Sequence, residues 1–461
     1  MKQKKEREKE ISQWPWISML PFGILAGYWG KREVRITAIS EYGFQTRLAT
    51  PATAEQKNAP WELAFYDQKT ASYQRILLRD ATLLQEKEED FDTVYTFATG
   101  QEDYRNAVQS LALQYSQYIR WKMEDDDAAL AEQMTGYPAE QDAFHLESLE
   151  EQKKVWFSEI RKATFVALQN GFAESGQPVE LALELDRPEW YKAYLSMESA
   201  VFFDVYFRRN QIPDPPVFHP DRLYIGNAFC PHLAPPEEEL FALMDKACRE
   251  SFVITLTFPF LLEENLTETQ ARLQHLARWC ERKNKTIEIV VNDWGTAHLA
   301  AQLPVFSLCL GVLLNKRKKD PRMAYKLGNR TLFEQNSVHA AFYREYLKEE
   351  FRMERYEWES CGDTSTRKFP EGKNSLRLPF YQTNTSQYCP LYAACTEGSR
   401  GAQVPIRECP KFCERQAFLY PEHLRMVGRY NSLFGVDLTV LKRTGAMLEL
   451  RGVDRVVVNL L

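Results

Sequence analysis

From Pro178 onward the chain alternates between short apolar runs and amphipathic segments, a pattern that few folds can satisfy. Strands buried on both faces and separated by helices form a mostly parallel sheet. Seven or eight such runs predict an α/β fold with an irregular TIM-like (β/α) barrel. No Gly-rich phosphate fingerprint follows any run, which disfavours an open doubly wound sheet. The runs are VELALEL, AVFFDVYF, RLYIG, FVITLTF, TIEIVVND, FSLCLGVLL, MERYEWES and SLRLPFY.

The amphipathic segments between these runs predict helices at 236–250, 267–284 and 337–351. A further helix is expected at 155–172, where the chain enters the barrel domain.

The first part of the chain has the period-two alternation of antiparallel strands. β-branched and aromatic residues recur in REVRITAISEYGFQTRL, WELAFYD, SYQRILLRDATLL and TVYTFATG. They predict a small antiparallel β-barrel, followed by a helix at 102–123. One face of that helix carries Tyr104, Val108, Leu111, Tyr115 and Ile119.

The length of 461 residues suits two or three domains. We expect a charged tail at 1–13, the N-terminal barrel with its helix at 14–123, an acidic linker at 124–152, and the large barrel at 153–461. The linker contains the run EDDDAALAEQ, which has little to bury.

The net charge and the N-terminal sequence indicate in which cellular compartment the protein is expected. The net charge of -6 gives no general footprint for nucleic acid or anionic membranes. The start MKQKKEREKE mixes both signs of charge, and prolines and glycines interrupt the apolar stretch after it. This is neither a signal peptide nor a spanning helix, so we expect a cytoplasmic protein without a membrane span. Disulfides are disfavoured there, and clustered thiols indicate metal ligands or catalytic groups.

Four of the nine cysteines fall within residues 389–413. Cys389, Cys395, Cys409 and Cys413 are separated by five, thirteen and three residues. Structural zinc sites usually have paired C-x2-C knuckles, whereas iron–sulfur clusters accept irregular spacing. A fifth cysteine, Cys230, follows the run RLYIG at a position where barrels present functional groups. Cys248, Cys280 and Cys309 are expected to be buried apolar residues, and Cys361 has no assigned role.

RLYIGNAFC, followed much later by C-x13-C-x3-C, resembles the collagenase-like peptidase family U thirty-two. The similarity is greatest to its iron–sulfur members, which are linked to oxygen-independent ubiquinone hydroxylation and tRNA hydroxylation. The phrases VVNDWG and LGVLLNKRKKDPR are also similar, so the resemblance covers about Val179 to Pro421. It implies a barrel of the TIM type and a [4Fe-4S] cluster. The implied ligands are Cys230, Cys395, Cys409 and Cys413, with Cys389 as a spare, a substitute or a redox neighbour.

The resemblance implies an iron–sulfur protein that supports an oxygen-independent hydroxylation or tailoring reaction. Its partners would be a small-molecule or RNA substrate and an electron-donor protein, with a hetero-oligomer possible. Two alternatives are a metal-assisted peptidase and a non-enzymatic regulatory or scaffold protein. Neither H-E-x-x-H nor G-x-S-x-G occurs in the sequence.

Two polar groups follow predicted strands. Asn292 and Asp293 end the strand TIEIVVND, where they could bind substrate or exchange protons, or could cap the next helix. Lys316 and Arg322, in the basic loop NKRKKDPR, are candidates to bind an anionic substrate or an RNA backbone, although such a loop is more often a solvated surface.

ITAISEYGF in the N-terminal part resembles the signature of PilZ domains, small barrels that bind cyclic di-GMP. Ser40 and Gly43 match, whereas Ala38 replaces the acidic or amide residue and Lys31 and Arg35 lie beside the strand. Binding of cyclic di-GMP is therefore doubtful, and a degenerate PilZ-like domain that contacts proteins is favoured.

Overall fold

The computed structural model describes residues 11–18, 21–68, 70–89, 91–123, 127–138, 145–148, 179–210, 220–361, 369–436 and 452–460. The chain divides into two compact units, Met1–Gln141 with Ala324–Arg330, and Asp142–Met323 with Thr331–Leu461. The helix expected at 155–172 lies outside the described residues. Among the described helices, none combines the length and the hydropathy that crossing a bilayer requires.

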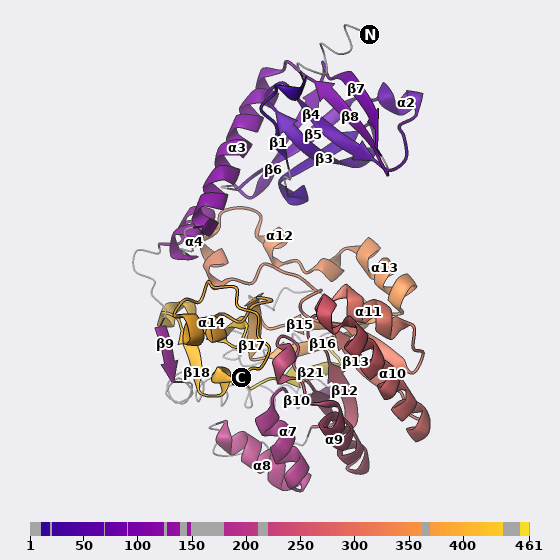
Figure 1. Cartoon of the computed structure of the whole chain (residues 1–461), viewed down its shortest axis with the longest axis vertical. Coiled ribbons are helices and arrows are strands. Elements are labelled where there is room, and N and C mark those ends of the chain that lie inside the picture. The colour runs from indigo at the N-terminus through magenta and orange to yellow at the C-terminus, as the bar shows by residue number, and fades with distance from the viewer. Residues whose placement is uncertain are drawn as a thin grey trace. The chain divides into compact units, whose positions relative to one another are not determined.

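The N-terminal unit contains an eight-stranded antiparallel sheet (Figure 1). The strand order is β6-β5-β2-β3-β4-β8-β7, with β1 on β3, so the predicted antiparallel strands are confirmed as a sheet. The strands are β1 (Ile17–Ser18), β2 (Leu25–Trp29), β3 (Arg32–Ser40), β4 (Gly43–Leu48), β5 (Trp61–Asp67), β6 (Ser72–Leu78), β7 (Thr82–Glu88) and β8 (Thr93–Ala98). The short helices η1 (Phe22–Ile24) and α2 (Ala54–Lys57) lie between strands.

Helix α3 (Glu102–Met123) packs on this sheet along the predicted face. Tyr104, Val108 and Leu111 are buried, whereas Ile119 is exposed. The Tyr104 hydroxyl lies 2.8 Å from the Ser40 carbonyl and 2.7 Å from the Gly43 carbonyl, and so ties the helix to the β3–β4 turn.

Residues 324–330, distant in sequence, also belong to the N-terminal unit. Lys326 donates to the carbonyls of Gln68 and Met134, and Tyr325 contacts Tyr137 edge to face at 5.1 Å. The range predicted as an acidic linker contains helix α4 (Asp127–Thr135) and strand β9 (His145–Ser148).

The second unit is built on a closed barrel of eight parallel strands. Hydrogen bonds connect neighbouring strands around the whole ring, in chain order. The strands are β10 (Glu180–Leu185), β11 (Arg222–Ile225), β12 (Val253–Thr257), β13 (Ile287–Val291), β14 (Phe306–Leu310), β15 (Arg355–Glu359), β16 (Lys373–Leu378) and β21 (Arg455–Val458).

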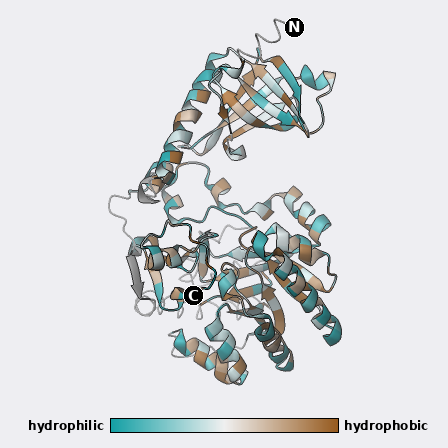
Figure 2. Ribbon diagram, viewed as in Figure 1, coloured by the Kyte–Doolittle hydropathy of each residue, from teal (hydrophilic) through white to brown (hydrophobic). Residues whose placement is uncertain are grey.

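Amphipathic helices pack around these strands, with hydrophobic and hydrophilic residues alternating along them in Figure 2. Among the described residues of this part of the chain, the α-helices are α7 (Pro188–Ser196), α8 (Ser199–Arg209), α9 (Glu237–Arg249), α10 (Leu266–Lys283), α11 (Trp294–Ala301), α12 (Arg330–Glu334), α13 (Ala341–Phe351) and α14 (Pro390–Glu397). The 3-10 turns are η3 (Pro231–Leu233), η4 (Glu263–Asn265), η5 (Pro321–Tyr325), η6 (Ser337–His339), η8 (Phe412–Glu414) and η9 (Glu422–Leu424).

One predicted strand is wrong. AVFFDVYF forms helix α8, because Phe202, Phe203, Tyr206 and Phe207 share one buried face at helical spacing. The eighth strand is instead β21, close to the C-terminus, which closes the ring between β10 and β16.

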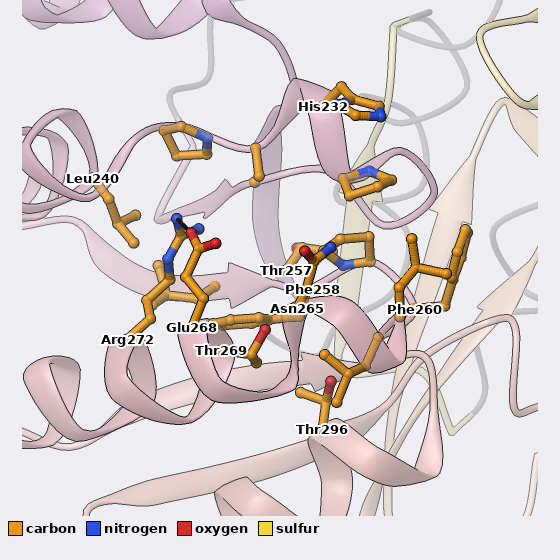
Figure 3. Close-up of a pocket in the computed structure, with 18 of the residues that line it drawn as sticks. His232, Leu240, Thr257, Phe258, Phe260, Asn265, Glu268, Thr269, Arg272 and Thr296 are labelled. Atoms are coloured by element: carbon orange, nitrogen blue, oxygen red, sulfur yellow. Dashed lines mark hydrogen bonds and ion pairs between the residues drawn. The ribbon is translucent and has the colours of Figure 1, made fainter. Parts of the chain in front are cut away.

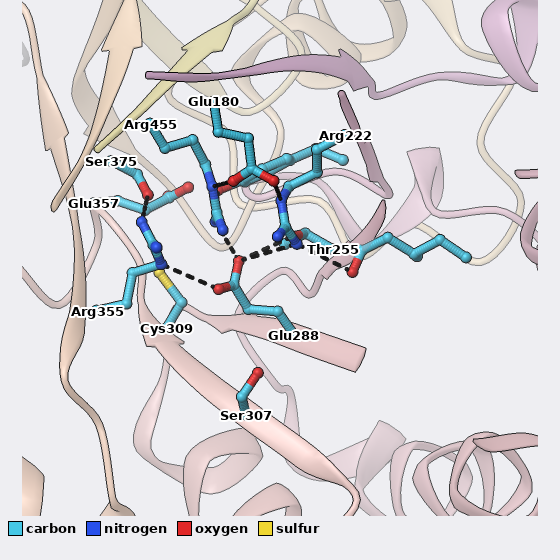
Figure 4. Close-up of polar contacts among 12 residues, drawn as sticks. Glu180, Arg222, Thr255, Glu288, Ser307, Cys309, Arg355, Glu357, Ser375 and Arg455 are labelled. Carbon is cyan, nitrogen blue, oxygen red and sulfur yellow. Dashed lines mark hydrogen bonds and ion pairs between the residues drawn. The ribbon is translucent and has the colours of Figure 1, made fainter. Parts of the chain in front are cut away.

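The barrel interior carries charged side chains at its amino end (Figure 4). Arg455 Nε lies 2.6 Å from Glu180 Oε2, and the same guanidinium also binds Glu288. Arg222 pairs with Glu180 at 2.8 Å and Arg355 with Glu288 at 3.2 Å. These ion pairs join five strands across the lumen, so oppositely charged side chains fill this end of the barrel.

A five-stranded antiparallel sheet follows the barrel strand β16. Its order is β17 (Phe380–Thr385), β20 (Ser432–Val436), β19 (Met426–Arg429), β18 (Gln416–Leu419) and β9. The cysteine-rich segment connects β17 to β18. Because β17 continues almost directly from β16, this segment lies beyond the carboxyl end of the barrel.

Candidate metal centre

Four cysteines from two distant segments line one small pocket. Cys230 comes from the β11–α9 connection, and Cys389, Cys409 and Cys413 come from the β17–β18 connection. The free volume is about 20 Å³, so a group held there must bond directly to the walls. The other lining residues are His232, Leu233, Leu391, Tyr392, Ile406, Phe412 and Tyr430.

The turn after β11 positions Cys230. Gly226 has φ +116°, and a Cβ there would lie 2.3 Å from the Thr257 carbonyl oxygen, so only glycine suits the position. The Asn227 carboxamide then accepts hydrogen bonds from the backbone N–H of Phe229 and of Cys230, both at 2.8 Å. These two residues were not singled out in the sequence, although the pair Gly-Asn after an apolar strand is a turn signal.

Asn431 connects the two cysteine segments. Its carboxamide donates to the Phe229 carbonyl at 2.7 Å and to the Ser386 carbonyl at 2.9 Å. Phe229 precedes Cys230 directly, and Ser386 lies three residues before Cys389. A single buried side chain therefore fixes the separation of the two segments that supply the thiols.

Cys389 lies at the N-cap of helix α14. Its sulfur accepts a hydrogen bond from the Tyr392 N–H at 3.4 Å, and Pro390 follows as the first helical residue. A sulfur at this position receives the positive end of the helix dipole, which favours a thiolate.

The structure does not bring Cys395 to this pocket, although the family resemblance implies it as a ligand. Cys395 lies within α14, and its thiol is 3.2 Å from the Gln416 side-chain oxygen. Cys280 and Cys309 are buried, as expected, whereas Cys248 is only partly buried; Cys361 is also buried.

Burial disfavours charge on three thiols of the pocket, those of Cys230, Cys389 and Cys413. Desolvation raises the pKa of Cys389 to about 11 and that of Cys413 to about 12, and neighbouring thiols add to both shifts. The pKa of Cys230 also rises, mainly through burial. Such thiols stay neutral near pH 7 unless a metal displaces their protons, which distinguishes them from reactive nucleophilic cysteines.

A single zinc ion and a cubane cluster place different demands on the spacing of four thiols. Within the described ranges, no group of three or more His, Cys, Asp or Glu side chains is arranged to hold one metal ion. Tetrahedral zinc would need sulfurs about 3.8 Å apart, given Zn–S bonds of about 2.3 Å. A cubane separates its thiolates more widely, and an all-cysteine donor set is the usual one for it.

His232 lines the thiol pocket and also a second, larger cavity, whose lining residues are drawn in Figure 3. The larger cavity has a volume of about 230 Å³ and lies between the carboxyl ends of β11 and β12 and helix α10. Phe258, Phe260 and several prolines and leucines form its apolar walls. Polar groups come from Thr257, Asn265, Glu268, Thr269 and Arg272.

Asn292 and Asp293 make structural contacts at the end of β13. The Asn292 amide donates to the Phe258 carbonyl at 2.9 Å and accepts from the Leu313 N–H at 3.4 Å. Asp293 is the N-cap of α11 and accepts from both the N–H and the hydroxyl of Thr296 at 2.8 Å. Asp293 therefore caps the helix, as one of the two alternatives predicted, and a catalytic role for Asn292 and Asp293 stays a prediction.

The basic side chains of the loop NKRKKDPR differ in their contacts. Lys316 is exposed, and Arg322 pairs with Asp320 at 2.6 Å. The sequence did not single out Lys319, whose buried ammonium binds Glu359 of β15 and lies 2.8 Å from the Gln382 side-chain oxygen. An anion could therefore approach Lys316 freely, whereas Arg322 already has a carboxylate partner.

Comparisons with known proteins add little to this geometry. No family model and no curated protein matches the chain. Among solved structures, the chain is similar to the crystal structure of the Borreliella burgdorferi PlzA protein in complex with c-di-GMP. The match covers 32% of this chain and 69% of the PlzA chain, with 12% sequence identity and a TM-score of 0.17. A TM-score this low does not establish a shared fold.

Proposed function

We propose that this protein binds a [4Fe-4S] cluster through Cys230, Cys389, Cys409 and Cys413. The cluster would lie beyond the carboxyl end of a TIM-type barrel and would support an oxygen-independent hydroxylation or a related tailoring reaction. The observation that carries the proposal is the convergence of four cysteines, from segments far apart in sequence, on one pocket.

Three features of the pocket support a cluster. All four candidate donors are sulfurs, which is the donor set of cubane clusters. Backbone N–H groups lie close to the sulfurs of Cys389 and Cys230, and such contacts stabilise thiolates. The remaining walls include leucine, isoleucine and aromatic side chains, which keep water from the site.

A cluster with all four thiolates bound supplies electron transfer. The larger cavity is the place for a small substrate, because His232 borders both spaces. Its aromatic and leucine walls would hold an apolar ring or chain, while Asn265, Thr269 and Arg272 would orient polar groups. The hydroxylation itself rests on the sequence resemblance to the collagenase-like peptidase family.

The test is anaerobic purification of the full chain, followed by reconstitution with iron and sulfide. We expect about four iron and four sulfide ions per chain and the broad visible absorption of a cubane cluster. A colourless protein that binds zinc with high affinity and takes up no sulfide would contradict the proposal.

A matched pair of variants makes the test specific to the pocket. Cys409→Ser should lose most of the iron and sulfide, whereas Cys280→Ser, in a helix of the barrel core, should keep both. Equal cluster content in the two variants would show that the four-cysteine pocket is not the binding site.

A further inference from the structure

Arg429, the last residue of β19, is a buried cation with an unsatisfied donor beside the thiol pocket. Its side chain is almost fully buried, and its Nε donates to the Cys413 carbonyl at 3.4 Å. Its Nη1 is buried without a hydrogen-bond acceptor. A buried donor without a partner is unfavourable, and more so when it is charged, so it requires an explanation.

Arg429 lies close to another buried cation, and none of the described carboxylates pairs with it. Arg187 is also buried and lies close enough to disfavour the charge on Arg429. Asp186 is the carboxylate beside this pair, and it lies 3.2 Å from Arg187 Nη1. Arg187 Nε also lies 3.8 Å from Glu189 Oε2, so Asp186 and Glu189 both pair with Arg187. Among the described residues, Arg429 has no carboxylate partner.

Arg377, a buried arginine of the same unit, differs from Arg429 because it has carboxylate partners. Its guanidinium contacts both Glu184 and Glu357. Uncompensated buried charge is strongly unfavourable, so the contrast at Arg429 indicates that an anion completes this site.

We propose that Arg429 is a positioning residue that supplies the counter-charge of the cluster, an inference that rests on the proposed function. A cubane with four thiolates is net negative, and each added electron makes it more so. A buried cation next to one ligand, Cys413, stabilises the reduced form more than the oxidised form. It therefore raises the reduction potential, which depends on net charge and on hydrogen bonds near the sulfurs.

The test compares the reduction potentials of reconstituted wild-type, Arg429→Gln and Arg429→Lys proteins in a titration followed by electron paramagnetic resonance. We expect Arg429→Gln to shift the potential to a more negative value, with roughly a tenfold lower ratio of reduced to oxidised cluster at the wild-type midpoint. Arg429→Lys should restore most of the shift, because it restores the charge.

Arg415→Gln is the control. It removes the same charge two residues from Cys413, but Arg415 is exposed, so solvent screens it and the potential should stay near the wild-type value. An unchanged potential in Arg429→Gln, with wild-type iron content, would overturn the inference.

The unfolding temperature, measured with and without the cluster, is a second readout. It can be used even if Arg429→Gln binds iron poorly. In the cluster-free protein, Arg429→Gln should unfold at the same or a higher temperature than the wild type, because it removes an uncompensated charge. In the loaded protein it should unfold at a lower temperature. Equal destabilisation in both states would mean a purely structural role, and failure of the wild type to bind a cluster would refute the proposed function itself.

Discussion

Arg377 Nη2 lies 2.6 Å from both carboxylate oxygens of Glu184, inside the closed barrel. The same guanidinium is 3.2 Å from Glu357, and all three side chains are buried. The single guanidinium of Arg377 therefore forms ion pairs with two carboxylates, one on strand β10 and one on strand β15. Because only one negative charge is balanced, the two carboxylates should share one proton.

The first prediction concerns the dependence of stability on pH. Burial raises the pKa of Glu357 to about 7, although Arg377 opposes the shift. The folded chain then binds more protons than the unfolded chain between about pH 4.5 and 7, so the contribution of Glu357 to the free energy of unfolding is lost as pH rises through this window. Urea unfolding at several pH values should show Glu357→Gln to be less sensitive to pH there than the wild type. An identical slope in the two proteins would contradict the shared proton.

Glu288, in the same lumen, should behave in the opposite way. Burial opposes its ionisation, but Arg455, Arg222 and Arg355 together lower its pKa. Its contribution is therefore present above its unfolded pKa and is lost as pH falls. We expect Glu288→Gln to reduce the free energy of unfolding at pH 7 by about 3 to 5 kcal/mol, the usual effect of breaking a buried ion pair. The loss should shrink below about pH 4, and a constant loss at every pH would contradict this account.

Asp293 tests whether a residue at the end of a barrel strand is only a cap. Asparagine is as good an N-cap as aspartate, whereas alanine cannot accept the Thr296 hydrogen bonds. Asp293→Ala should cost about 1 kcal/mol in thermal or urea unfolding, and Asp293→Asn much less. Equal losses in the two variants would show that the negative charge, and not the cap, is what the protein requires.

Seven of the eight barrel strands were predictable, because each is a short apolar run followed by a turn or a helix, whereas β21 was not among the predicted strands. The exception, residues 200–207, shows the limit of that rule: a short apolar run can bury itself equally well as a helix, and α8 does so. The lumen charges were not predictable, because Glu184 and Arg377 are far apart in sequence. Their pairing exists only once the ring has closed.

The cysteines that line the thiol pocket were predictable in part. Cys230, Cys409 and Cys413 do line one pocket, whereas Cys389 takes the place expected for Cys395. The reason is local: residues 390–397 form a helix and not an irregular loop. Six residues along a helix turn a side chain by about 240°, so the thiols of Cys389 and Cys395 point in different directions.

The N-terminal unit offers a test of the Tyr104 hydroxyl. It is buried and contacts the carbonyls of Ser40 and Gly43, which flank the β3–β4 turn. Tyr104→Phe should destabilise this unit by about 1 to 3 kcal/mol, because buried carbonyls lose a donor. Hydrogen exchange of the full chain should show faster exchange in β3 and β4, with the barrel strands unchanged. Tyr42→Phe, at an exposed tyrosine beside the same turn, should leave exchange unaltered.

The choice between Cys389 and Cys395 gives the sharpest prediction for the site. Both are cysteines of the same short segment, so Cys389→Ser and Cys395→Ser are closely matched substitutions. The pocket predicts that Cys389→Ser loses most of the cluster after anaerobic reconstitution, because serine is a poor substitute for a thiolate at iron. Cys395→Ser should retain wild-type iron, sulfide and visible absorption, because its thiol contacts Gln416 and not the pocket. The reverse outcome would restore the ligand set that the sequence resemblance implies, and would require α14 to rearrange when the cluster binds.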